Sequence, residues 1–365
     1  MNRTVLGGTA LAVLGAATAG YIALGSIGFA QGSLQTPAVD IAVSDSFEDA
    51  PTDAKTQAIV AAADAFLATL SDEDRALTVY DLTDNTQRAN WSNFPTGPVQ
   101  RGGVMRGNLT DDQNAAMDAL LAEVMSAEGF NNIKYQLAAE ETLDRGTGGR
   151  ALFGDEYYFL SFVGTPSETQ PWMLQFGGHH LAINVSFYGG DAAFSPMLTG
   201  GEPLRIDYDG DQVFITEKEL TAAAAFMDSL SDDQLTTAIR GSKAIQLLTG
   251  PGDYGVVPVN EGIKGSDLSD AQQALLLDVI AARLGFINDD DFAANMAPIR
   301  ATLDDTYFGW WSPEAPMGAA YFRITGPNLI LEYSPQDLGG DPTDHAHNMY
   351  RDPTNDYGAV WLAGQ

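Results

Sequence analysis

The chain of 365 residues contains no cysteine, and only five of its eighteen basic residues are lysine. Without cysteine, disulfide bonds cannot stabilise the fold, so stability has to come from packing or from a bound ion. Histidine is also scarce. The four histidines fall into two tight clusters, His179 with His180 and His345 with His347. Clustered imidazoles are typical of a metal site or a proton-transfer site.

Positive charge is the second thing the chain lacks, because its formal net charge at pH 7 is −31. A surface of this sign repels polyphosphate, so we expect no nucleic-acid partner. An acidic surface with few lysines also suits an exported protein in salt water, where counterions screen the self-repulsion. Solubility alone is the simpler interpretation of the charge.

Long apolar runs are absent after Gln31, so we expect a soluble body with no membrane contact beyond the N-terminus. There, Asn2 and Arg3 precede an apolar stretch over 5–29, and Gly28-Phe29-Ala30 forms a small-x-small cleavage site. We interpret residues 1–30 as a signal peptide and expect a periplasmic or extracellular location. The apolar stretch is longer than a usual signal core, so an uncleaved membrane anchor is the alternative.

The remaining chain divides by composition. Residues 31–56 are rich in Asp, Ser, Thr, Pro and Ala without periodicity, which predicts a flexible acidic linker. Residues 57–365 are long enough to bury one large core. We interpret them as a single domain made of two repeats, over about 57–215 and 216–365.

The repeat is carried by two helical segments and a strand pair. Residues 61–72 resemble 222–232, with Ser71 and Ser231 offset by 160 positions, and 107–113 resemble 265–272. In the second pair Thr110 or Ser269 is followed three residues later by Gln, which predicts a capping box at a helix start.

Strand-like sequence follows in each copy. Residues 156–162 parallel 305–311, and second strands are expected over 173–187 and 320–333. The predicted fold class is therefore α+β, with two related halves. Each half has about three helices followed by a β-hairpin, and the halves pool their strands into one antiparallel sheet flanked by helices.

Strand alternation predicts which way the first histidines face. Over 179–187 the odd positions after His179 are apolar and the even positions are mostly polar, so His180 is expected on the polar face. His179 is expected to be structural. Aligning 178–184 with 326–332 places Glu332 opposite Asn184, which makes Glu332 a candidate for the same site as His180.

The C-terminal pair has spacing i and i+2, so in an extended chain both rings point the same way, about 6–7 Å apart. We therefore predict a divalent transition metal, either zinc, copper, iron or manganese, held by three histidines and one carboxylate. The predicted ligands are His180, Glu332, His345 and His347. Residues predicted to support them are His179, Asn184, Asp344, Arg351 and Asp352. The alternative is that His345 and His347 only cap the domain through backbone hydrogen bonds.

Three tryptophans are candidates for a pocket wall around a small-molecule ligand, namely Trp172, Trp310 and Trp311. The alternative for these residues is a place in the core. A Gly-x-Ser-x-Gly elbow is absent, which argues against a serine hydrolase.

Several motifs together resemble the bacterial family known as domain of unknown function 3500. They are Tyr157-Tyr158, 164–167, Pro171-Trp172, 178–181 and the closing stretch 345–358. Glu332 also looks like a family position, whereas Met173 and Asn348 depart from the usual pattern. The resemblance covers nearly the whole mature chain and implies one family domain and an exported context for many members, but no established activity.

We thus expect an exported metal-binding protein, either a metal-dependent hydrolase or an oxidoreductase, with its catalytic residues unassigned. The alternative is a non-catalytic protein that binds a metal or a small ligand. An open coordination position beside a pocket favours the enzyme, and a closed four-ligand shell favours the structural role.

Overall fold

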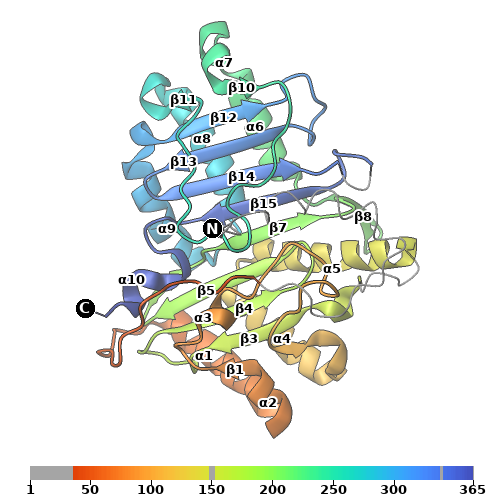
Figure 1. The fold of residues 1–365 in the computed structure, drawn as a ribbon, viewed down its shortest axis with the longest axis vertical. Helices are drawn as coiled ribbons and strands as arrows, with labels where there is room; N and C mark the ends of the chain where they lie inside the picture. Colours follow the sequence, from red (N-terminus) through yellow and green to blue (C-terminus); the bar gives the residue numbers. More distant parts are fainter. Residues whose placement is uncertain (1–35, 148–152, 338–339, 365) are drawn as a thin grey trace, which may run out of the picture.

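The computed structural model describes residues 36–147, 153–337 and 340–364, so the predicted signal peptide lies outside the described residues. These residues form a mixed α+β fold built on one 13-stranded sheet. Figure 1 shows α6 and α8 behind one half of the sheet, with the segment 242–262 crossing in front of it. Long loops therefore cover the face opposite these helices.

The sheet runs in the order β1-β3-β4-β5-β7-β15-β14-β13-β12-β10, with β2, β6 and β11 pairing at its margins and β8 and β9 forming a separate hairpin. The last strand in sequence, β15, lies at the centre between β7 and β14. The strands are β1 (Val79–Tyr80), β2 (Val104–Met105), β3 (Phe159–Val163), β4 (Trp172–Gly177), β5 (Ala182–Tyr188), β6 (Asp191–Ala193), β7 (Met197–Gly201), β8 (Arg205–Tyr208), β9 (Asp211–Phe214), β10 (Ile239–Gly241), β11 (Ile263–Lys264), β12 (Tyr307–Trp311), β13 (Tyr321–Gly326), β14 (Leu329–Pro335) and β15 (Ala346–Arg351).

The helices pack in pairs against the larger hydrophobic core, α1 with α4 and α6 with α8. Capping boxes open α4 at Thr110, α7 at Ser231 and α8 at Ser269, as predicted from the Ser/Thr-x-x-Gln spacing. The helices are α1 (Ala54–Thr69), α2 (Asp72–Thr78), α3 (Asn85–Arg88), α4 (Asp111–Val124), α5 (Ala127–Thr147), α6 (Glu217–Asp228), α7 (Asp232–Ala238), α8 (Asp270–Leu284), α9 (Asp289–Ala301) and α10 (Ala359–Leu362).

A smaller core fills the opposite face of the sheet. Val39 and Ile41 are buried there against sheet residues such as Met349, and the N–H of Ser44 donates to the carbonyl of Leu362. Within the predicted linker over 31–56, Val39 and Ile41 therefore pack on the sheet, and α1 already begins at Ala54. Alternating valine and isoleucine give this extended segment an apolar edge that can be buried without regular secondary structure.

Two features of the predicted sheet also differ in the structure. The sheet is mixed, because β1 pairs in parallel with β3 and β10 in parallel with β12. The expected single strands over 173–187 and 320–333 are each two strands, β4 with β5 and β13 with β14. Within the described ranges, every helix is too short or too polar to cross a bilayer.

Candidate metal centre

His179 and His180 occupy a turn between β4 and β5, which corrects the prediction that they lie on a strand. The N–H of Gly178 donates to the carbonyl of Leu181 at 3.0 Å and closes this turn. His180 has φ of 57°, in the left-handed region where histidine is among the more tolerated residues. Strand alternation begins only at Ala182, so the parity argument for the two rings does not apply.

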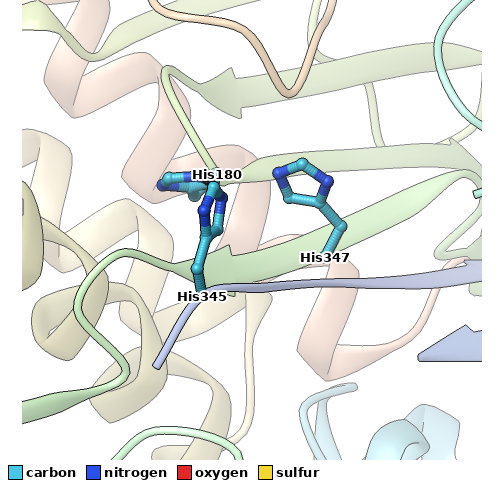
Figure 2. Close-up of side chains that lie close together, drawn as sticks. All are labelled: His180, His345 and His347. Atoms are coloured by element: carbon cyan, nitrogen blue, oxygen red, sulfur yellow. Dashed lines mark hydrogen bonds between the residues drawn. The ribbon is translucent and has the colours of Figure 1, made fainter. Parts of the chain in front are cut away.

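His345 and His347 come from the start of β15, where the chain is extended. Their ring centroids are 5.4 Å apart, which agrees with the expectation that an i, i+2 pair projects from one side of a strand. Figure 2 shows both rings beside that of His180, which reaches them from the β4–β5 turn. The structure thus brings together histidines 165 and 167 positions apart in sequence.

The three rings converge closely. Nε2 of His180 lies 3.1 Å from Nε2 of His345, and the ring centroids of His180 and His347 are 5.2 Å apart. One nitrogen from each ring can be chosen so that all three lie within 4.8 Å of one another. Two ligands at 2.0–2.1 Å from a tetrahedral zinc are separated by about 3.3 Å. The observed nitrogen separation is therefore close to that of a metal site.

A carboxylate lies near Nδ1 of two of these rings. Oε1 of Glu140, on α5, lies 3.0 Å from Nδ1 of His180 and 2.9 Å from Nδ1 of His179. Oε2 of Glu202, just after β7, lies 3.6 Å from Nδ1 of His345. The Glu140 contact fixes the tautomer of His180 so that its Nε2 keeps the lone pair, as a metal-bound histidine requires, whereas the Glu202 contact is too long for a hydrogen bond.

Burial sets the protonation states of the cluster. Desolvation lowers the pKa of His180 to about 4, and that of His347 falls well below its ordinary value of 6.5. Burial opposes the charge on Glu140, but the nearby rings of His179 and His180 lower its pKa to about 2. Two neutral imidazoles beside a charged carboxylate are thus in the states that bind a cation.

His347 has a buried ring nitrogen with no hydrogen-bond partner among the described residues, its Nε2. The amide of Asn93 lies 3.3 Å from the other ring nitrogen, Nδ1. The atom at this distance is the amide nitrogen Nδ2, which donates to Nδ1 and so leaves the ring proton on Nε2; the tautomer that binds a metal through Nε2 requires the Asn93 amide to turn over. An orphaned buried nitrogen costs about 1–3 kcal/mol, which a ligand would recover.

Glu332, predicted as the fourth ligand, is not brought to the histidines. Its buried carboxylate accepts hydrogen bonds from the backbone N–H groups of Leu248 and Thr249, from the Thr249 hydroxyl and from the hydroxyl of Tyr321. It joins no group of clustered ligand atoms among the described residues. Its role in this structure is to hold the segment around Thr249 against β14.

The predicted supporting residues also have other partners. Asn184 bonds to Gln175 and to the carbonyl of Pro196, and Asp344 accepts from the N–H groups of Leu204 and Arg205. Arg351 donates to the carbonyls of Thr249 and Gly250 and to the carboxylate of Asp356. Asp352 accepts hydrogen bonds from the N–H and the hydroxyl of Thr354. Among the predicted supports, His179 does contact the cluster, with its ring centroid 3.5 Å from that of His180.

The three predicted pocket tryptophans occupy different places. Trp172 stacks on Phe187 with ring centroids 4.5 Å apart, whereas Trp310 stacks on Phe322 in the helix-side core. Trp311 faces the opposite side of β12, beside Arg323. They share no common wall, because neighbouring residues on a strand point to opposite faces.

Sequence reasoning missed Glu140, Glu202 and Asn93. A signal for Glu140 is present in α5, where Asn132, Gln136 and Glu140 recur every four residues on the buried face. Polar residues on the inner stripe of a helix are costly unless they are paired, so such a row marks buried polar contacts. The signals for Glu202 and Asn93 are weaker because both lie in loops.

Comparisons with curated proteins and with solved structures found no match. The model of one family does match, over residues 52–359 and so over most of the sequence. Its matched range contains every residue of the histidine cluster. The chain therefore belongs to the family described as "Protein of unknown function (DUF3500)".

Proposed function

We propose that this is an exported metal-binding protein whose ion is held by His180, His345 and His347. The observation that carries the proposal is the convergence of three buried imidazoles, with 3.1 Å between two Nε2 atoms and an orphaned Nε2 on the third ring. Glu140 would hold His180 in the binding tautomer through its Nδ1–H.

The donor set favours particular ions. Three neutral nitrogens suit Zn²⁺ or Cu²⁺, whereas Mg²⁺, Ca²⁺ and Mn²⁺ prefer oxygen donors and the common non-haem iron site uses one carboxylate. A set of three protein ligands also leaves one tetrahedral position for water or another small ligand. This feature supports a catalytic centre over a closed structural site.

Metal-assisted hydrolysis is the activity that this arrangement supports best. A bound zinc ion lowers the pKa of its water to about 7, which supplies hydroxide near neutral pH. Burial raises the pKa of Glu202 to about 7, so this partly exposed carboxyl can take up or release a proton beside His345. Glu140 stays ionised and keeps His180 oriented.

A non-catalytic metal-binding role is the second candidate. It is favoured by burial, since His180, His345 and His347 expose only 1%, 5% and 7% of their surface. A substrate larger than water therefore needs the covering segment around Asn93 to move. Turnover of ester, amide or phosphoester substrates by zinc-loaded protein separates the two functions.

Metal analysis of protein purified without a histidine tag tests the centre. We expect wild type to carry zinc or copper, and His345→Ala and His347→Ala each to carry at least one ion fewer per chain. Glu332→Gln is the matched control, because Glu332 is bound to the segment around Thr249 and its replacement should leave the metal content unchanged. Equal trace metal in wild type and both histidine variants would rule out the centre.

Export is supported by the signal-like sequence over 1–30 and by the high negative charge. N-terminal sequencing of the protein recovered outside the cytoplasm should give a first residue of Gln31. Recovery of intact Met1 in the membrane fraction would favour the uncleaved anchor instead.

We also propose that the two halves arose by duplication. The proposal is supported by the order of their elements: α1-α2-β1 and α6-α7-β10 are each followed by a short strand, a pair of helices and three strands, and the first half has one additional helix, α3. The starts of α4 and α8 are offset by 159 positions, and those of β3 and β12 by 148. Comparison of the halves across family members should recover the same offsets, and unrelated halves would contradict it.

A further inference from the structure

His180 belongs to two clusters at once, one on each ring nitrogen. Its Nε2 faces His345 and His347, whereas its Nδ1 faces Glu140 and His179. In each cluster the chosen ligand atoms lie within 4.8 Å of one another, and every residue is buried. A single imidazole thus joins two adjacent groups of possible ligands.

We propose that Glu140, His179 and Nδ1 of His180 form a second transition-metal site, and that the His180 imidazolate bridges two ions. The inference rests on the proposed three-histidine centre for the first ion. Binding of the second ion displaces the Nδ1 proton of His180 to solvent, and no electrons are transferred. Zn²⁺ and Cu²⁺ are the ions expected, because two of the three donors are imidazole nitrogens.

The geometry of the second cluster supports this assignment. Ligands placed 2.0–2.2 Å from one ion at angles of 90–110° are separated by about 2.8–3.6 Å. Oε1 of Glu140 lies 2.9 Å from Nδ1 of His179 and 3.0 Å from Nδ1 of His180. Both separations fall within this range, and the ligand atoms of the three residues all lie within 4.8 Å of one another.

His179 supplies the independent observation. Its ring is 4% exposed, and its Nδ1 makes no directed hydrogen bond among the described residues although Glu140 is near. Phe153 stacks on the ring with centroids 5.2 Å apart, and the hydroxyl of Tyr158 donates to the backbone carbonyl of His179. The ring is therefore held with Nδ1 2.9 Å from Oε1 of Glu140 but outside hydrogen-bond geometry, as expected for two atoms that face a common ion.

Charge gives a further reason for a carboxylate in this cluster. Two buried dications are costly unless anions neutralise them. The Glu140 carboxylate and a bridging imidazolate each contribute one negative charge directly at the second ion. Glu202 adds another carboxyl group beside His345 at the first ion.

The test uses the full-length protein, stripped with a chelator and reloaded with Zn²⁺ or Cu²⁺. We expect two tightly bound ions per chain in wild type. His179→Ala should bind one, because His179 belongs only to the second cluster, and His347→Ala should also bind one because it belongs only to the first. In copper-loaded wild type the bridged ions should couple magnetically, so the EPR signal should fall well below two spins per chain. His179→Ala should give one full spin.

The outcomes separate this inference from the proposed function. One ion in both wild type and His179→Ala, with loss in His347→Ala, would overturn the second site while leaving the three-histidine centre intact. Absence of binding in wild type would overturn both. His179→Gln, which retains a side chain of similar reach beside Phe153, replaces His179→Ala if the alanine variant does not fold by circular dichroism.

Discussion

Replacing Glu332 with alanine is expected to lower the free energy of unfolding by about 3–5 kcal/mol, because buried donors lose a charged acceptor. Two backbone N–H groups, at Leu248 and Thr249, and the hydroxyl of Tyr321 all donate to this carboxylate. Arg351 binds the carbonyls on the same segment, so the loss also loosens the loop over β14. Urea unfolding followed by far-ultraviolet circular dichroism measures the effect.

Glu332→Gln is the matched control for this prediction. The amide keeps one acceptor oxygen and nearly the same shape, so it should cost about half as much as alanine. Metal content should stay at the wild-type level in the glutamine variant. A cost below about 1 kcal/mol for alanine would show that the hydrogen bonds of Glu332 add little to stability.

Acid is expected to destabilise the metal-free protein strongly between pH 6.5 and pH 4. The pKa of His180 is about 4 in the folded protein and 6.5 in its ordinary state, so within this range only the unfolded chain takes up the proton. The free energy of unfolding therefore falls as pH falls, by about 3 kcal/mol for this one residue. His347, whose pKa is also lowered by burial, acts in the same direction.

At lower pH, Glu140 causes a second decline in the free energy of unfolding. Its folded pKa of about 2 lies below its ordinary 4.5, so the stability that it contributes is present above pH 4.5 and is lost as pH falls toward 2. Chemical denaturation of chelator-treated protein at a series of pH values measures both declines. His347→Asn should make the upper decline shallower without removing the part due to His180, and a constant stability of wild type from pH 6.5 to 4.5 would contradict the prediction.

The part of the candidate site that sequence predicts well is local. The spacing of His345 and His347 predicts that they share one side of an extended chain, and their rings do lie together. Capping boxes are likewise predicted from four consecutive residues and are present. The histidine pair depends only on the alternation of an extended backbone, and the capping box only on the first turn of a helix.

The part that fails depends on long-range pairing. Matching the two hairpins placed Glu332 with His180, but His180 lies in a turn and takes its carboxylate from α5, forty residues earlier. Glu332 instead faces the segment around Thr249, 83 residues before it. Which helix packs behind a turn is decided by the assembled core, and alternation within one strand carries no information about it.

The central position of β15 means that the sheet cannot finish folding until this last strand has been made. Its neighbours β7 and β14 leave the ribosome earlier, and each exposes an unpaired edge until residues 346–351 arrive between them. Open strand edges are templates for pairing with other chains. We therefore expect the nascent chain to depend on protection by chaperones until residues 346–351 are free to pair. The same late strand delivers His345 and His347, so metal capture can begin only after this strand has left the ribosome.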